Sequence, residues 1–168
     1  MPRLTLTEVD ALAARAHAGQ VDKIGVPYVE HVRAVAAALA PFGTGLQMAG
    51  LLHDVLEDTE LTAEDLLRAG VPSAVVATVR AVTKAPGADY TAMLHAITAD
   101  HSATLLKIAD NAHNSRPDRA ARLAEEQRHR LAERYRAARA VLWPAASPAD
   151  VRAIVATANP ALLAELAE

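Results

Sequence analysis

The chain has 168 residues, of which 52% are hydrophobic but only 3% aromatic, and its formal net charge is −3. This length fits one domain, and a hydrophobic fraction dominated by Ala and Leu favours packed helices over a β-sandwich. The absence of cysteine excludes disulfides and thiolate zinc sites, and the negative charge argues against general nucleic-acid binding while leaving room for a local basic pocket.

The N-terminal stretch does not have the pattern of a secretory signal, because Glu8, Asp10 and Arg15 interrupt it. The longest apolar stretches, such as residues 34–42, fall well short of the roughly 20 residues that a membrane helix needs. We therefore expect a soluble, cytoplasmic protein that does not enter a membrane.

The first predicted helix covers residues 8–18, with Thr7 as its N-cap and Gly19 as its stop. Residues 19–28 contain two glycines and a proline, which predicts a loop. Apolar residues at intervals of three and four predict a helix over 29–40 and another over 46–56.

The middle of the chain shows clear helix boundaries. Thr62 and Asp65 have the spacing of a capping box for a helix that ends at Gly70, and Pro72 is expected to open the next one, which runs to Thr83. Residues 85–89 are expected to form a loop. Two further helices are then expected over residues 90–99 and 103–114.

Residues 118–142 predict one long amphipathic helix whose charges face solvent. Ser147, Pro148 and Asp150 have the pattern of an N-cap, a first helical position and an acidic third position. We expect an all-α fold with a domain over 1–146 and a helical extension over 147–168, which either packs on that domain or pairs with a second copy in a homo-oligomer.

The dipeptide His53-Asp54 stands in a helix that is otherwise apolar. A buried carboxylate beside an imidazole needs compensation, which a divalent cation supplies efficiently. Glu57 and Asp58 follow four positions later, so that on a continuous helix His53 and Glu57 share one face and Asp54 and Asp58 its neighbour.

A catalytic metal ion needs ligands from several elements, and His31 and Asp110 on other predicted helices can join His53 and Asp54 as ligands. Two imidazoles and two carboxylates form a mixed nitrogen and oxygen set that suits Mn²⁺, Fe²⁺, Mg²⁺ or Zn²⁺. Because the chain lacks thiolates, a catalytic ion is favoured over a structural zinc ion.

These motifs resemble those of a known family. The segments are AHAGQVDKIGVPYVEHV (16–32), AGLLHDVLEDT (49–59), VTK (82–84) and LLKIADNAHNSR (105–116). In order and spacing they resemble the HD-type hydrolase domain of Rel-type alarmone enzymes and small alarmone hydrolases. The resemblance extends over about residues 10–140.

The resemblance implies an all-α hydrolase that binds one Mn²⁺ through His31, His53, Asp54 and Asp110. It implies removal of the 3′-pyrophosphate from ppGpp and pppGpp, which releases GDP or GTP and pyrophosphate. The acidic pair Glu57 and Asp58 would position and activate the attacking water; the alternative is that both only cap a helix end and face solvent.

The resemblance also implies substrate contacts at the positions that match the family's motifs. The residues concerned are Lys23, Tyr28, Lys84, Tyr90, Asn114, Arg116 and Tyr135, each of which could also serve packing or the surface. His17, His95, His101 and His129 are interpreted as structural or exposed, and His113 as a helix-packing residue beside the site.

Two positions depart from the family pattern. Asp22 stands where long Rel enzymes place an arginine that stacks on guanine, and Asn111 replaces an arginine that follows the metal-binding aspartate. An acid cannot reproduce a guanidinium stack, so base recognition is open.

Three functions follow as hypotheses. The first is Mn²⁺-dependent alarmone hydrolysis without synthesis, since the remaining residues leave no room for a synthetase domain. The second is hydrolysis of another nucleotide, an adenine alarmone or an NADPH-like dinucleotide phosphate. The third is a non-catalytic helical module that binds nucleotide.

Overall fold

The computed structural model describes residues 3–166, and this part of the chain is helical without any strand. The predicted all-α fold is confirmed. The elements are α1 (Leu6–Ala16), α2 (Tyr28–Ala38), η1 (Ala40–Phe42), α3 (Thr44–Leu52), α4 (Val55–Asp58), α5 (Ala63–Ala69), α6 (Ser73–Val82), α7 (Tyr90–Ile97), α8 (His101–Asn114), α9 (Pro117–Ala120), α10 (Glu125–Leu142), η2 (Trp143–Ala145), α11 (Pro148–Ala158) and η3 (Pro160–Leu166).

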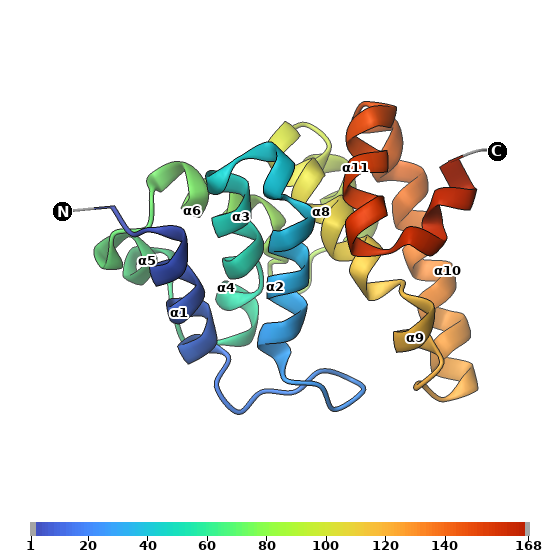
Figure 1. The fold of residues 1–168 in the computed structure, drawn as a ribbon, viewed down its shortest axis with the longest axis horizontal. Coiled ribbons are helices and arrows are strands. Elements are labelled where there is room, and N and C mark those ends of the chain that lie inside the picture. The colour runs from blue at the N-terminus through green and yellow to red at the C-terminus, as the bar shows by residue number, and fades with distance from the viewer. Residues whose placement is uncertain (1–2, 167–168) are drawn as a thin grey trace.

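The core forms around α2, α3 and α8. Helices α2 and α3 pack against each other, and α8 contacts both, while α6 packs on α3 and α8 from one side and α11 packs on α2 and α8 from the other (Figure 1). Leu52, Leu105 and Ile154 are among the fully buried side chains that join these helices. Burial of such side chains stabilises the fold by about 1.5–3 kcal/mol each.

Several predicted helix ends are confirmed. The hydroxyl of Thr62 accepts the N–H of Asp65, whose carboxylate accepts the N–H of Thr62, and Gly70 ends the helix in the left-handed region at φ 98°. Ser147 caps α11, and Pro148 occupies its first turn. These local patterns decide helix boundaries because they satisfy the backbone groups that a helix end leaves open.

Other helix starts differ from the prediction. The first helix begins at Leu6 because Thr5, and not Thr7, forms a capping box with Glu8. Pro72 is the residue before α6 rather than its first member. Helix α8 begins at His101, two residues earlier than expected, because the Asp100 carboxylate accepts the N–H of Ala103.

The predicted helix over 46–56 is wrong in one important respect, since it is interrupted at His53 and Asp54. The Gly50 carbonyl, which an uninterrupted helix would offer to residue 54, accepts a hydrogen bond from the His53 ring at 2.8 Å. A new short helix, α4, then starts with the Asp54 carbonyl accepting the N–H groups of Glu57 and Asp58. His53 and Glu57 therefore do not share the face of one continuous helix.

The predicted long helix over 118–142 is also wrong, because the chain forms α9 first and starts α10 only at Glu125. Helix α9 and the segment after it are held by the loop over residues 17–27. Arg119 pairs with Asp22, and Arg122 donates to the carbonyl oxygen of Ile24 at 2.7 Å. This tertiary contact explains why the helical sequence pattern is interrupted.

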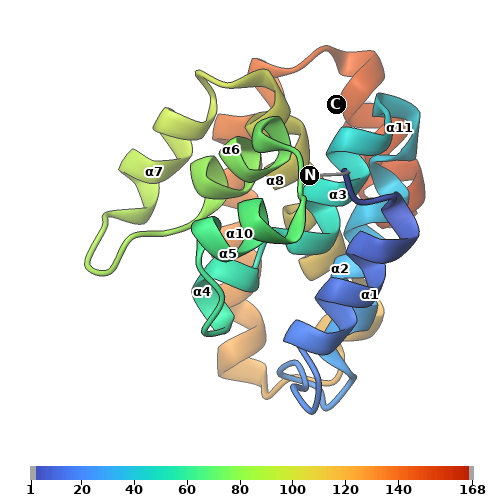
Figure 2. The same ribbon diagram turned by 90° about the vertical axis from the view of Figure 1, so that its left-hand side faces the viewer.

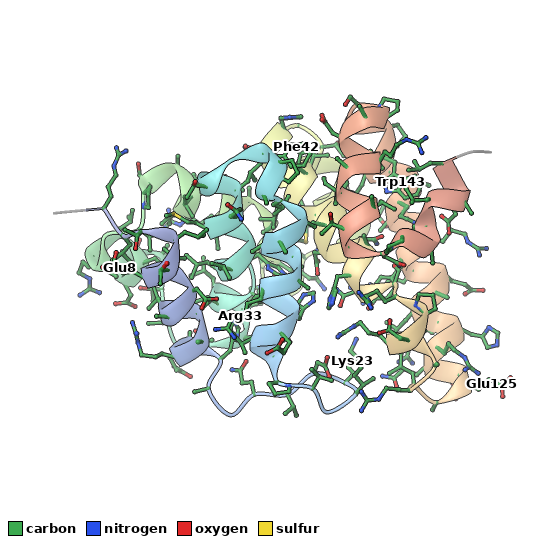
Figure 3. The ribbon with its side chains drawn as sticks, viewed as in Figure 1. Glu8, Lys23, Arg33, Phe42, Glu125 and Trp143 are labelled. Atoms are coloured by element: carbon green, nitrogen blue, oxygen red, sulfur yellow. The ribbon has the colours of Figure 1, made fainter. Side chains whose placement is uncertain are left out.

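The loop over residues 17–27 runs along one end of the molecule toward α9 (Figure 1). Lys23 lies on this loop, on the side of α9 and α10 (Figure 3). Helix α7 and the loop over 83–89 that leads into it stand out from the body of the molecule (Figure 2). In the part of the chain that the structure describes, no helix is both long and apolar enough to cross a membrane.

Candidate metal centre and adjoining cavities

Four side chains from α2, the α3–α4 junction and α8 converge at one point. The Nε2 atom of His31 lies 3.6 Å from Asp54 Oδ2 and 3.2 Å from Asp110 Oδ1. The Nε2 atom of His53 lies 3.0 Å and 3.6 Å from the same two oxygens. Ligand atoms of His31, His53 and Asp54 all lie within 4.8 Å of one another, so that these residues could hold a metal ion.

The His53 ring fits the role of a metal ligand. Its Nδ1 donates to the Gly50 carbonyl, so that Nε2 is the ring nitrogen that faces the centre. Although Asp54 Oδ2 is close, this Nε2 is buried and has no hydrogen-bond partner among the described residues. A buried imidazole nitrogen that lies between two carboxylates is a site where a divalent cation can replace the proton.

His31 is held by a second imidazole. Its Nδ1 lies 2.8 Å from Nδ1 of His113, and both rings are buried. Burial and the neighbouring His31 lower the pKa of His113 to about 3, so His113 is neutral and can accept this hydrogen bond. With its Nδ1 directed at His113, His31 presents its Nε2 to the centre.

The charges at the centre call for a cation. Burial raises the pKa of Asp54, but the adjacent His53 outweighs it and brings the value down to about 2. Burial lowers the pKa of His53, but Asp54 and Asp110 outweigh it and raise the value well above the usual range. Two ionised aspartates, of which Asp110 is buried and Asp54 half-buried, therefore stabilise positive charge at the point where the imidazoles meet.

Polar neighbours hold both carboxylates in place. The Tyr28 hydroxyl donates to Asp54 Oδ2 at 2.6 Å. Asp110 accepts from the Asn114 amide at 2.7 Å and from the Lys107 ammonium at 2.8 Å. Such outer partners orient the ligands of a metal ion and restrict their rotation.

Glu57 and Asp58 lie next to the centre on α4, and both are exposed to solvent. Glu57 accepts the backbone N–H of Lys84, which joins α4 to the segment after α6. Although both side chains reach solvent, the surrounding protein partly desolvates them, and together with the nearby Asp54 this raises the pKa of each of the two carboxyl groups. A carboxylate with a raised pKa is better suited to accept a proton.

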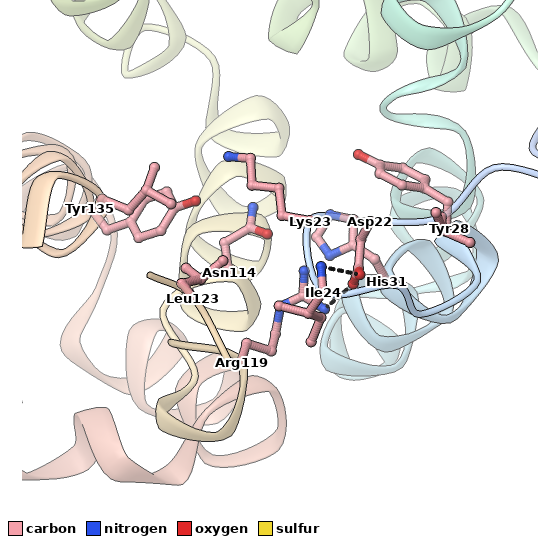
Figure 4. A pocket seen from close by; sticks show the side chains of 11 residues that line it. Asp22, Lys23, Ile24, Tyr28, His31, Asn114, Arg119, Leu123 and Tyr135 are labelled. Atoms are coloured by element: carbon pink, nitrogen blue, oxygen red, sulfur yellow. Dashed lines mark hydrogen bonds and ion pairs between the residues drawn. The ribbon is translucent and has the colours of Figure 1, made fainter. Parts of the chain in front are cut away.

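A cavity of about 250 Å³, which we call the main cavity, adjoins His31 (Figure 4). One wall carries an ion pair that is largely buried, in which Arg119 Nη1 lies 2.7 Å from Asp22 Oδ2. The other oxygen of Asp22 accepts the N–H groups of Ile24 and Val26. The residues that line the main cavity are Val21, Asp22, Lys23, Ile24, Tyr28, His31, Asn114, Arg119, Leu123, Leu131 and Tyr135.

A second cavity of about 140 Å³, which we call the side cavity, adjoins Asp110. It shares Lys23, Asn114, Leu131 and Tyr135 with the main cavity. The residues that line the side cavity are Lys23, Tyr90, Lys107, Asp110, Asn111, Asn114, Leu131, Arg134 and Tyr135. The two cavities thus extend from neighbouring ligands of one centre.

Most residues proposed from the sequence as substrate contacts line these cavities, and two do not. Lys84 lines an exposed hollow with Glu57 and Asp58. Arg116 lies outside both cavities, where its guanidinium pairs with Asp118 at 2.9 Å. The structure therefore brings Arg116 to neither cavity.

Sequence reasoning missed Lys107, Arg119 and Arg134, and it treated His113 as packing only. Lys107 could have been found, because it stands three positions before Asp110, within reach on one helix. Arg119 could not, because nothing in the sequence relates it to Asp22, from which it is 97 positions distant. The buried Asn111 donates to the carbonyl oxygen of Tyr135, so it joins α8 to α10.

The HD domain family matches residues 10–142, which is more than half of the 168 residues. The chain belongs to the HD domain family. Membership agrees with the resemblance inferred from the His53-Asp54 dipeptide and the motifs around it.

Curated relatives of this HD domain chain include enzymes of alarmone metabolism. The bifunctional (p)ppGpp synthase/hydrolase SpoT of Escherichia coli (strain K12) is 34% identical over 139 residues, which cover 72% of this chain and 20% of SpoT. The guanosine-3′,5′-bis(diphosphate) 3′-pyrophosphohydrolase of Haemophilus influenzae is 35% identical over 134 residues, 68% of this chain and 20% of that protein. The chain thus spans about a fifth of the length of these relatives.

A solved structure has the same fold as this HD domain chain. It is that of a metazoan ortholog of SpoT, which hydrolyzes ppGpp and plays a role in starvation responses. The TM-score is 0.68 and the identity 23%, with 98% of this chain and 97% of that chain covered. The likeness shows that the fold extends over nearly the whole of both chains.

Proposed function

We propose that this HD domain is a metal-dependent hydrolase that removes the 3′-pyrophosphate from ppGpp and pppGpp. The observation that carries the proposal is the convergence of His31, His53, Asp54 and Asp110 beside a cavity that reaches outward from them. The named activities of the relatives support the choice of substrate.

His31, His53, Asp54 and Asp110 would hold the ion, for which we propose Mn²⁺, with Fe²⁺, Mg²⁺ and Zn²⁺ as alternatives. The donor set fits, because His53 Nε2 is buried without a hydrogen-bond partner and both aspartates are ionised. A bound divalent ion would supply Lewis acidity toward water and phosphate.

In the proposed reaction a water oxygen forms a bond to the phosphorus next to the ribose 3′ oxygen. The bond between that phosphorus and the 3′ oxygen breaks, which releases pyrophosphate and leaves a 3′ hydroxyl. Glu57 or Asp58 would accept the proton of the water, a role that their raised pKa values support. The leaving 3′ oxygen takes up a proton.

We propose that Lys23, Tyr28, Asn114 and Tyr135 contact the nucleotide, since all four line the main cavity. Tyr28 also donates a hydrogen bond to Asp54, so it would both orient a metal ligand and contact the substrate. Tyr90 would contribute from the side cavity, and Lys84 from the hollow beside Glu57.

One observation favours a second candidate function, hydrolysis of a different nucleotide. The Asp22 carboxylate accepts two backbone N–H groups and pairs with Arg119, so it has little capacity left to recognise the edge of guanine. An adenine alarmone or a dinucleotide phosphate such as NADPH is the alternative substrate.

A panel of nucleotides assayed with and without Mn²⁺ tests the proposal. We expect pyrophosphate release from ppGpp that requires the metal, and loss of both metal content and activity in Asp54→Ala. The matched control is Asp89→Ala, which removes an exposed carboxylate outside the centre. Turnover of another nucleotide in place of ppGpp would favour the second function, and unchanged metal content in Asp54→Ala would contradict the metal site.

A further inference from the structure

The side cavity is lined by a candidate metal ligand and by several cationic side chains. Asp110, Lys23, Lys107 and Arg134 are among the residues that line it. Lys107 is occupied by its ion pair with Asp110 at 2.8 Å. The remaining cations, Lys23 and Arg134, determine what this cavity can bind.

These cations are not neutralised by the protein. Among the described residues, no carboxylate lies within 4.0 Å of the charged groups of Lys23, Arg130 or Arg134, whereas Arg119 is paired with Asp22. Burial lowers the pKa of Lys23, and the charges of Arg134, Arg130 and Arg119 lower it further. Neighbouring positive charges that no carboxylate neutralises favour the binding of an anion.

Arg134 is oriented before any ligand arrives. Its guanidinium carbon lies 4.2 Å from the centroid of the Tyr90 ring, which also lines the side cavity. This stacking restricts the arginine while its N–H groups stay available. Although Arg134 is exposed, its planar guanidinium stacks on this ring and can present N–H groups to the oxygens of a phosphate group.

The two cavities differ in chemistry although they extend from the same centre. The main cavity has apolar walls at Val21, Ile24 and Leu123, and its Arg119 is neutralised by Asp22. These features suit a nucleoside. The side cavity adds the unpaired Arg134 to Lys23, which lines both cavities, and therefore suits a second anionic group.

We propose that the side cavity binds the polyphosphate on the ribose 5′ oxygen of the substrate, through Arg134 and Lys23, while the 3′-pyrophosphate lies at the metal centre. The proposal rests on the proposed function, because it requires a nucleotide that carries phosphates at two positions. Arg134 and Lys23 would thus make the enzyme selective for the number of 5′ phosphates.

The test compares three substrates that share the guanosine 3′-diphosphate and differ at the 5′ position, which carries a monophosphate, a diphosphate or a triphosphate. For the unmodified enzyme with Mn²⁺, we expect kcat/KM to rise by about tenfold from monophosphate to diphosphate, equivalent to about 1.4 kcal/mol. Arg134→Gln should abolish this difference, and Arg134→Lys should restore part of it.

The matched control is Arg136→Gln, which removes an exposed arginine of the same helix that lines neither cavity. It should keep the preference for 5′ phosphates. Equal kcat/KM for all three substrates in the unmodified enzyme, or an unchanged preference in Arg134→Gln, would overturn the proposal and leave the proposed hydrolysis intact.

Binding without turnover separates this proposal from the proposed function. Calorimetry should show that the unmodified protein binds GDP about tenfold more tightly than GMP, and that Arg134→Gln binds both equally. If ppGpp releases no pyrophosphate, the proposed function fails, but the ratio of the two dissociation constants still decides whether the side cavity binds 5′ phosphates. Equal affinity for GDP and GMP would overturn the side-cavity proposal.

Discussion

At the scale of single residues, we propose that Asp22 and Arg119 together accommodate the departure from the family pattern at position 22. The aspartate does not face a nucleotide as an isolated acid, because Arg119 binds it across the chain at 2.7 Å. A guanidinium therefore lines the main cavity, supplied by α9 in place of the loop. Because its charge is balanced by Asp22, its flat face is better suited to a base than to a phosphate.

Replacing Arg119 tests this interpretation. We expect Arg119→Ala and Arg119→Lys to weaken GDP binding alike, by about threefold to tenfold, because lysine keeps the charge but not the plane. Calorimetry with GDP measures the effect. Inorganic pyrophosphate, which carries no base, serves as the control ligand. With Mn²⁺ in excess, its inhibition constant against ppGpp hydrolysis should not change. A parallel loss for pyrophosphate would show that Arg119 binds phosphate instead.

Glu57 connects electrostatics to the pH dependence of activity. Burial and the negative charge of Asp54 raise its pKa, so its basic form is lost at a higher pH than for an ordinary glutamate. As the proton acceptor it must be ionised, and kcat/KM should therefore decline as the pH falls through this raised pKa.

Glu57→Gln should lower kcat by about 10²-fold to 10⁴-fold and remove this decline from a pH profile measured by pyrophosphate release. The control is Glu60→Gln, which replaces an exposed glutamate that makes no salt bridge within the described part of the chain. A Glu57→Gln enzyme with the original kcat and pH profile would leave Asp58 as the candidate base.

At the scale of elements, the close packing of α2 against α3 positions His31 beside His53. A Cβ atom built on Gly50 would lie 2.9 Å from the Ala36 Cα and 3.0 Å from its backbone nitrogen. Only glycine therefore allows the two backbones to approach this closely. The same glycine offers its carbonyl to the His53 ring, so one residue sets both the distance between helices and the orientation of a ligand.

Gly50→Ala should force the two helices apart. We expect a loss of about 1–3 kcal/mol in the free energy of unfolding, as for other overpacked cores, together with weaker Mn²⁺ binding. Urea unfolding and metal titration measure these effects. Gly45→Ala is the control on the same helix, since a Cβ there meets nothing within 4 Å. Equal stability of the two variants would contradict the role of close packing.

At the scale of the whole molecule, the C-terminal segment is joined to the helices that carry the site. Arg139 on α10 is buried and pairs with Glu165 on η3 through two contacts of 2.9 Å. The Asn159 amide donates to the carbonyl oxygen of Ala112 on α8. These contacts connect residues after 147 to the helix that carries Asp110, while the division at residue 147 and a homo-oligomer stay predictions.

Glu165→Ala should leave the buried Arg139 charge without its partner. We expect a loss of about 1.5 kcal/mol in the free energy of unfolding, at the low end for a charged hydrogen bond because Glu165 is itself partly exposed. Urea unfolding measures the loss, and Glu133→Ala, on the exposed face of α10, is the control. Unchanged stability would show that the pair contributes nothing.

The sequence by itself determined the helical class, many helix ends and the family. These follow from local chemistry, since a capping box such as Thr62 with Asp65 involves residues three positions apart. The sequence also predicted the set His31, His53, Asp54 and Asp110, because polar residues in apolar helices need a shared partner.

Only the tertiary structure decided which groups surround that set. His31 meets His113 across 82 positions, and Asp22 meets Arg119 across 97. The break at His53 and the split between α9 and α10 likewise depend on hydrogen bonds that compete with a continuous helix. Such contacts depend on how helices pack, and helical periodicity describes only which face of each helix is apolar.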